Sequence, residues 1–487
     1  MKQLKILFVT SELTPFAMTG GLGDVSASLP KALFKRGHDI RVFMPLYGNI
    51  PGQSLNRLAS PLGVPTGEGE LWCAVRHTTY PNSGFPVYFL EHDALYDRNG
   101  LYGDEHGVYG DNLLRFTLLS RGALQFCHYM NWYPDVIHVN DWQTSLIPAY
   151  LNTIERHSPL GQAATLLTIH NLGYQGKFSS ESFPVTVLPW ELFTYLGFEA
   201  YNQINLLKGG IYHSTLINTV SNTYAHEIQT PEKGEGLDGV LRDRGADLYG
   251  IVNGIDDEVW NPETDPLLDA NYNVDDLSGK KTCKTSLQRD LGLYVNPDVP
   301  LISIITRLAW QKGTDVLAAT IRRLLSLDIQ FVLIGTGDKS QEAFFKSLNS
   351  EFKGKYKAII DFNSKLAHRT EAASDLYLMP SRYEPCGLNQ MYSMRYGTLP
   401  IVRSTGGLAD TVTNYDEKIG NGTGFKFWDL SPEAIYGVVS WSVETFYKRK
   451  NHFQNMIKKA MKKDFGWNKA AAEYEELYMR AVYFRRS

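Results

Sequence analysis

The sequence predicts an α/β protein built from two doubly wound domains, and three observations support this prediction. Its 487 residues exceed the ~250–300 residues at which a single core usually stops growing. Short apolar runs alternate with longer amphipathic stretches, as in parallel sheets with crossover helices. The alternation starts again after a polar, turn-rich interval, so we expect two sheets facing a central cleft.

The first half contains the pattern of one parallel sheet. The run at 5–9 predicts a buried strand, and a glycine-rich turn follows it. A helix should then extend from about Gly23 to Arg36, where Gly37 ends it, and 40–44 should form the next strand. Further strands are expected at 86–90, 135–139 and 164–170.

The second half repeats this architecture without repeating the sequence. The run at 301–305 predicts a strand, followed by a loop to Gly313 and a helix from about Asp315. Further strands are expected within 331–338 and at 357–362, 376–379 and 400–402. The domain boundary should lie within 245–265, and the polar segment 262–282 is expected to be a surface connection. We therefore predict domains at 1–250 and 251–460, with a final segment at 461–487.

Composition and charge exclude several classes of protein. A formal net charge of −4 argues against binding nucleic acid through a basic field. No run of ~18 apolar residues is present, so no membrane span is expected. The four cysteines are far apart, which fits a reduced, cytoplasmic setting. No metal-ligand spacing or Walker motif occurs, so we expect neither a metal nor a cofactor.

The glycine-rich turn at 19–25 is the first candidate for ligand binding. Gly20 and Gly21 precede a helix start, where backbone N–H groups can approach a phosphate and the helix dipole favours negative charge. The spacing is not GxGxxG, which weakens a dinucleotide interpretation. A tight turn with Asp24 as a first-turn acid explains the pattern equally well.

Polar residues follow two strands of the first domain. One of these strands ends at His138 and 140–142, and the next ends at His170 and Asn171. A single histidine in a turn is usually structural. Because the carboxyl ends of neighbouring parallel strands converge on one edge, we expect these two groups to share a site.

Two cations lie in the loop after the first strand of the second domain. Arg307 could clamp phosphate oxygens bidentately, and Lys312 could act as a point charge. Together they suit a diphosphate, which they could neutralise without a metal. The alternative is a solvated basic loop.

The segment 381–390 carries the strongest signal. It follows the strand at 376–379 and opens a helix, which places Glu384 beside backbone N–H donors, where its carboxylate could accept sugar hydroxyls. Downstream, 404–410 contains Thr405, Gly406 and Gly407 and repeats the phosphate-loop pattern. A helix cap would explain one carboxylate, but not this many special residues at element junctions.

These motifs resemble those of the bacterial glycogen synthases and plant starch synthases, almost from end to end. The resemblance implies the GT-B fold, with two Rossmann-like domains and a C-terminal helix that crosses back to the first domain. It implies transfer of glucose from ADP-glucose to the non-reducing end of an α-1,4-glucan, with retention and without a metal. The matching motifs are 11–12, 19–25, 140–142, 168–171, 252–256, Arg307 with Lys312, 383–388 and 404–412.

Carried over by position, the resemblance implies roles for particular residues. Glu384, His170 and Asp141 are the candidate catalytic residues, and glycogen or a malto-oligosaccharide is the implied acceptor. The family usually has lysine where this chain has Met18, a loss of one phosphate contact that could cost roughly 1.5–3 kcal/mol. The candidate substrate-binding positions are Met18, Gly20, Gly21, Asp24, Asn253, Arg307, Lys312, Thr405, Gly406 and Gly407.

Other interpretations stay open at this point. The donor could be UDP-glucose, or the product trehalose or sucrose, on the same fold. Met18 favours a catalytically weak glucan-binding protein. Twin α/β sheets also suit a nicotinamide dehydrogenase, but the missing GxGxxG and the cations at 307 and 312 argue against it.

Overall fold

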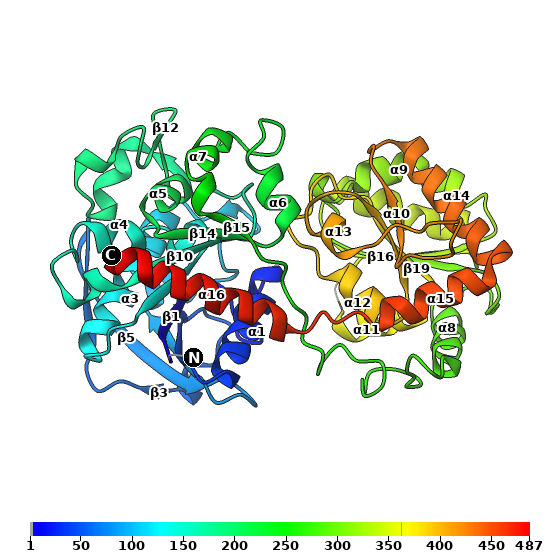
Figure 1. Ribbon diagram of the computed structural model, residues 1–487, viewed down its shortest axis with the longest axis horizontal. Helices are drawn as coiled ribbons and strands as arrows, with labels where there is room; N and C mark the ends of the chain where they lie inside the picture. Colours follow the sequence, from blue (N-terminus) through cyan, green and yellow to red (C-terminus); the bar gives the residue numbers. More distant parts are fainter. Residues whose placement is uncertain (1–2, 362) are drawn as a thin grey trace. The chain divides into compact units, whose positions relative to one another are not determined.

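The computed structural model describes residues 3–361 and 363–487, so Phe362, at the end of one expected strand, lies outside the described residues. The chain forms two compact units (Figure 1). The first comprises Met1–Gly254 and Trp467–Ser487, and the second comprises Ile255–Gly466. The two boundaries between the units lie a few residues beyond the predicted positions 250 and 460. Ile255 donates its N–H to the Phe465 carbonyl (2.8 Å), and this hydrogen bond keeps both residues in the second unit.

The first unit is built on one large sheet. Its strand order is β15-β14-β10-β9-β1-β2-β6-β5-β3, with β4 paired to β5. The parallel strands are β1 (Lys5–Val9), β2 (Asp39–Pro45), β6 (Pro86–Glu91), β9 (Val136–Asn140), β10 (Ala164–Ile169), β14 (Leu216–Thr219) and β15 (Leu248–Gly250). An antiparallel extension, which the sequence analysis did not predict, adds β3 (Asn56–Arg57), β4 (Leu62–Thr66) and β5 (Gly69–Thr79).

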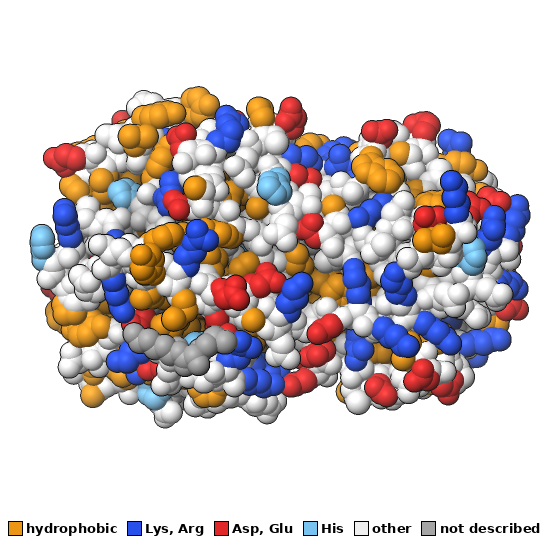
Figure 2. Space-filling model, in the orientation of Figure 1, with side chains coloured by type: hydrophobic (Ala, Val, Ile, Leu, Met, Phe, Trp, Pro, Cys, Tyr) orange, Lys and Arg blue, Asp and Glu red, His pale blue; other side chains and the backbone are white. Residues whose placement is uncertain are grey.

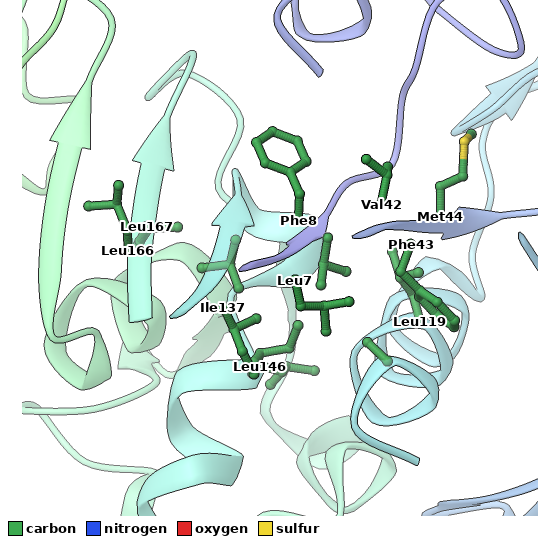
Figure 3. Packing of buried hydrophobic residues seen from close by; sticks show 14 of the residues in the cluster. Leu7, Phe8, Val42, Phe43, Met44, Leu119, Ile137, Leu146, Leu166 and Leu167 are labelled. Atoms are coloured by element: carbon green, nitrogen blue, oxygen red, sulfur yellow. The ribbon is translucent and has the colours of Figure 1, made fainter. Parts of the chain in front are cut away.

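Helices cover both faces of this sheet, as a doubly wound fold requires. In Figure 3, Phe8 and Val42 point to one face, while Leu7 and Phe43 point to the other, toward Leu119. The principal helices of the first unit are α1 (Gly21–Lys35), α3 (Asn112–Tyr129), α4 (Ile147–Asn152), α5 (Leu206–His213), α6 (Asn222–Glu227), α7 (Asp238–Asp243) and α16 (Trp467–Arg486). Short strands β7 (Gly103–Asp104) with β8 (Gly107–Val108), and β11 (Lys177–Ser179), β12 (Glu199–Ala200) and β13 (Gln203–Asn205), form two small sheets.

The second unit has a smaller, wholly parallel sheet in the order β18-β17-β16-β19-β20-β21. Its strands are β16 (Leu301–Ile305), β17 (Gln330–Ile334), β18 (Tyr356–Ile359), β19 (Leu376–Met379), β20 (Leu399–Arg403) and β21 (Phe425–Phe427). Its helices are α8 (Ser278–Asp290), α9 (Thr314–Leu324), α10 (Lys339–Glu351), α11 (Ser364–Ala373), α12 (Asn389–Arg395), α13 (Gly406–Thr411), α14 (Pro432–Lys448) and α15 (Lys450–Met461). On the face shown in Figure 2, Lys and Arg gather over α15.

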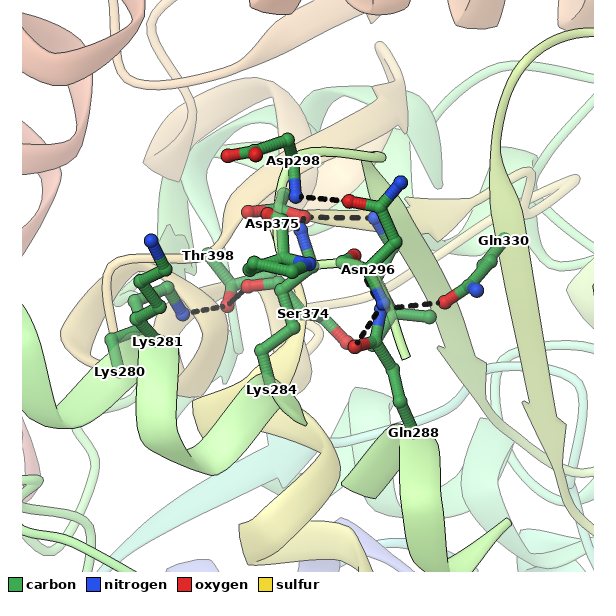
Figure 4. A network of polar contacts seen from close by, with 12 residues as sticks. Lys280, Lys281, Lys284, Gln288, Asn296, Asp298, Gln330, Ser374, Asp375 and Thr398 are labelled. Carbon is green, nitrogen blue, oxygen red and sulfur yellow. Dashed lines mark hydrogen bonds and ion pairs between the residues drawn. The ribbon is translucent and has the colours of Figure 1, made fainter. Parts of the chain in front are cut away.

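The prediction of a surface connection at 262–282 was wrong, because this segment contributes buried polar side chains to the second unit. Asp265 is 3% exposed and accepts hydrogen bonds from Tyr396 Oη (2.6 Å) and from His368 Nδ1 (2.7 Å). Lys280 is also buried and donates to Thr398 Oγ1 (2.9 Å), as Figure 4 shows. Polar composition suggested solvent exposure here, whereas both polar groups find hydrogen-bond partners inside the second unit.

Candidate functional site

The glycine loop of the first unit is held by Glu12, which the sequence analysis named only within the matching motif 11–12 and to which it gave no role. Glu12 is buried and accepts the backbone N–H of Thr19 (2.7 Å) and of Gly20 (3.2 Å), together with the hydroxyl of Thr19 (2.7 Å). Tyr102 donates its hydroxyl to the same carboxylate (2.7 Å). The only signal in the sequence was the place of Glu12 directly before the loop.

The N-terminus of α1, which follows the loop held by Glu12, is exposed to solvent. Gly21 is the exposed first residue of α1, and its N–H makes no hydrogen bond among the described residues. Asp24 accepts the hydroxyl of Thr14 (3.2 Å). Met18 is 44% exposed, so its position faces solvent beside the loop. The loop thus offers a helix N-terminus to an anion, with no cation at position 18.

Asp141 and His170 lie together at the carboxyl ends of β9 and β10. Asp141 accepts the backbone N–H of His170 on Oδ1 (2.7 Å), and Asn140 Oδ1 lies 2.9 Å from His170 Nε2. Because Asn140 gives its Nδ2 to the Val9 carbonyl (2.9 Å), its oxygen faces His170, and Nε2 must carry the proton. The other nitrogen, Nδ1, makes no hydrogen bond among the described residues, so it can accept one from a ligand hydroxyl.

Burial shifts the pKa values of His170 and Asp141. It lowers the pKa of His170 to about 3, so the imidazole is neutral at physiological pH. Burial raises the pKa of Asp141 to about 7, although the backbone N–H groups of His170 and Asn171 oppose the shift. Asp141 also has a φ of 53° and a ψ of −168°, a conformation reached almost solely by glycine.

His138 does not join these residues at the strand ends, and that expectation was wrong. It is 1% exposed and bonds to Tyr478 and Thr168 below the surface, because the alternation of the strand places it one layer beneath Asn140. Asn253, in the segment after β15, is also buried, and its side-chain oxygen has no hydrogen-bond partner within the described residues. Because buried polar groups normally have a partner, this oxygen is available to a ligand or a water.

In the second unit, the predicted cation and carboxylate form an ion pair. Lys312 Nζ donates to both carboxylate oxygens of Glu384, at 2.8 and 2.6 Å, and Ser381 donates its hydroxyl to Oε2 (2.9 Å). Glu384 is 5% exposed. Arg307 is exposed and makes no hydrogen bond or ion pair with any described residue. One paired and one unpaired cation therefore follow the same strand, β16.

The second glycine loop packs against the segment that carries Glu384. The N–H of Gly407 lies 3.1 Å from the carbonyls of Glu384 and Pro385, so this amide is engaged within the protein. A Cβ on Gly406, whose φ is 44°, would lie 1.9 Å from the Glu384 carbonyl. Glycine is needed here for this close approach, and Thr405 is the N-cap residue of the short helix α13.

Comparisons with known proteins show the family of this chain. The family model of the starch synthase catalytic domain matches residues 5–243, and that of glycosyl transferases group 1 matches residues 293–463. Glycogen synthase 1 of Geobacter sulfurreducens is 51% identical over 99% of this chain and 97% of its own length. Glycogen synthase of Anaeromyxobacter sp. is 46% identical over 98% of this chain and 99% of its own.

Among solved structures, this chain is similar to the catalytic domain of starch synthase IV from Arabidopsis thaliana, bound to ADP and acarbose. The two superpose with a TM-score of 0.92 and are 33% identical. The match covers 99% of this chain and all of that one. Sucrose-phosphate synthase from Thermosynechococcus elongatus shares the fold alone, with a TM-score of 0.62 at 16% identity over the full length of both chains.

The fold and these matches define a glycosyltransferase with the GT-B fold, as the sequence predicted. More particularly, the chain belongs to the family of bacterial glycogen synthases and plant starch synthases. Among the helices described, none is both long and apolar enough to cross a bilayer.

Proposed function

We propose that the protein transfers glucose from ADP-glucose to the non-reducing end of an α-1,4-glucan, with retention of the anomeric configuration. The observation that carries this proposal is the ion pair of Lys312 with the buried carboxylate of Glu384, together with the unpaired Arg307 that follows the same strand. Curated glycogen synthases of high identity and a relative bound to ADP and acarbose support the choice of donor and acceptor. The four free, buried cysteines suit a reducing compartment, so we place the reaction in the cytoplasm.

The second unit binds the donor in this proposal. Arg307 and Lys312 contact the diphosphate and stabilise the charge that develops as it leaves. Glu384 orients the donor glucose and holds Lys312 in place through two hydrogen bonds. Thr405, Gly406 and Gly407 shape the backbone around Glu384.

The first unit contributes the groups that face sugar and phosphate. Neutral His170 accepts a sugar hydroxyl on Nδ1, and Asp141 fixes the backbone of His170. The helix start at Gly20 and Gly21 receives a phosphate, with Asp24 stabilising the turn through Thr14. The orphan oxygen of Asn253 accepts a hydrogen bond from the ligand.

Incubation with glycogen and labelled ADP-glucose or UDP-glucose tests the proposal. We expect label in glycogen chiefly from ADP-glucose, and its release by an exo-hydrolase specific for α-1,4 bonds. Preferred use of UDP-glucose would overturn the donor assignment. No incorporation from either donor would favour the catalytically weak glucan-binding protein that Met18 suggests.

Substitution of Met18 by lysine should improve donor binding. The position is 44% exposed and directly precedes Thr19, whose backbone Glu12 holds in place, so a lysine there could reach a phosphate at the helix start. A charge-assisted bond of this kind contributes about 1.5–3 kcal/mol, so we expect Met18→Lys to lower the donor KM about tenfold or more. Met18→Gln, which keeps about the length of the methionine and adds polarity without charge, should leave the donor KM close to that of the wild type.

A further inference from the structure

A chain of buried hydrogen bonds runs from the C-terminal helix α16 to the strands that carry the sugar-site residues. Tyr478 on α16 bonds to His138 Nδ1 (2.7 Å), and His138 Nε2 bonds to Thr168 Oγ1 (2.6 Å). Thr168 bonds in turn to Asn218 Oδ1 (2.6 Å), and Asn218 Nδ2 donates to the hydroxyl of Tyr474 (3.0 Å). Four elements, α16, β9, β10 and β14, are therefore linked through side chains alone.

The hydroxyl proton of Tyr478 determines which group donates in each hydrogen bond around His138. Tyr478 is 0% exposed, and its hydroxyl has no other hydrogen-bond partner among the described residues, so its proton must be donated to His138 Nδ1. His138 then carries its own proton on Nε2 and donates it to Thr168. Burial and the nearby His170 lower the pKa of His138 well below its usual value, so the ring stays neutral.

The bond between His138 and Thr168 lies directly beneath the sugar site. On β9, His138 precedes Asn140 by two residues. Thr168, on β10, precedes by two residues His170, which directly follows that strand, so all four side chains lie toward one face of the sheet. The strands are thus joined by two side-chain rungs, a lower rung from His138 to Thr168 and an upper rung from Asn140 to His170. Thr168 also accepts the N–H of Asp141 on its carbonyl (2.9 Å), which ties the lower rung to Asp141.

Contacts outside this network also hold α16 in place. Glu475 on α16 is 4% exposed, lies 2.7 Å from His38 Nε2 and pairs with Arg36. Arg485 donates to Asn152 Oδ1 (2.6 Å) near the other end of the helix. Removing a single tyrosine hydroxyl should therefore leave α16 docked, so the hydroxyl can be tested by itself.

We propose that α16 is part of the sugar site, because the Tyr478 hydroxyl holds His138 as its Nε2–H tautomer and the lower rung then sets the position of His170. Tyr478, His138 and Thr168 are positioning residues that touch no substrate. The inference rests on the role proposed above for His170 as an acceptor of a sugar hydroxyl. A misplacement of about 1 Å in such a group can cost up to about 100-fold in rate.

Tyr478→Phe tests the proposal, with Tyr150→Phe as the matched control. Tyr150 is equally buried in the same unit and donates its hydroxyl to the Thr186 carbonyl (2.6 Å), outside the network. We expect Tyr478→Phe to lower kcat about tenfold with the donor KM nearly unchanged, and Tyr150→Phe to change neither. Equal kcat in the two variants would overturn the proposal.

Two further measurements separate positioning from a general loss of stability. Nitrogen NMR of histidine-labelled protein should show His138 as the Nε2–H tautomer in the wild type and a changed tautomer population in Tyr478→Phe. The Nδ1–H tautomer in the wild type would contradict the proposed network. Adding Tyr478→Phe to His170→Ala should cause no further loss of kcat, since the hydroxyl acts through His170.

The same set of variants distinguishes this inference from the proposed function. Wild-type kcat in His170→Ala would refute the role proposed for His170. An impaired His170→Ala beside an unimpaired Tyr478→Phe would refute only the role of α16. Full additivity of the two substitutions would show that Tyr478 acts elsewhere, and it would overturn the inference as well.

Discussion

Replacing Glu384 with alanine should nearly abolish glucose transfer, with kcat lowered by about 10²- to 10³-fold or more. The carboxylate is buried and holds Lys312 through both oxygens, and Ser381 donates a third hydrogen bond to it. Without Glu384, the donor glucose loses its orienting acceptor and Lys312 loses its fixed position. The lysine remains free to contact phosphate, so we expect binding of ADP, measured by calorimetry, to be retained while transfer is lost.

Matched variants make this prediction specific. Glu384→Gln keeps the shape of the side chain but removes the charge, so its kcat should lie close to that of the alanine variant. Glu351→Ala breaks an exposed ion pair with Arg322 elsewhere in the second unit and should leave kcat unchanged. Near-wild-type transfer by either Glu384 variant would contradict the role assigned to this carboxylate.

Replacing Asp141 should separate activity from stability. Asp141→Gly and Asp141→Ala both remove the carboxylate that holds the His170 backbone, so each should lower kcat about 100-fold. Only glycine adopts the backbone conformation at this position without strain. We therefore expect the glycine variant to have a free energy of unfolding about 1–3 kcal/mol higher than that of the alanine variant, as measured by denaturant titration. Equal stability of the two variants would show that position 141 is unstrained.

The raised pKa of Asp141 also predicts a pH dependence. Its folded-state pKa of about 7 lies above the usual aspartate value near 4, so the folded protein binds more protons than the unfolded chain between these pH values. The contribution of Asp141 to stability is therefore fully present below pH ~4 and is lost as the pH rises through 7. Asp141→Asn should gain stability relative to the wild type over this interval. A stability difference that stays constant from pH 4 to 8 would contradict the shifted pKa.

The sequence by itself determined the parallel strands of both sheets and the residues at their carboxyl ends. Apolar runs marked strands such as β1 and β16, because a strand buried on both faces must be apolar along its length. Residues directly after such strands, including Asp141, His170 and Arg307, must then lie at one edge of their sheet. The motif around Glu384 gave the family, which the comparisons confirm.

Only the tertiary structure decided which of these groups pair with one another. Lys312 and Glu384 are 72 residues apart in the chain, and periodicity cannot show that they form an ion pair. The motif at 11–12 did not show that Glu12 holds the glycine loop, and Tyr478 lies in no motif. His138 looked like a site residue until its two buried partners were known. The physical reason is that a hydrogen bond depends on distances of a few tenths of an ångström between distant segments, whereas sequence periodicity reports only which face of an element is buried.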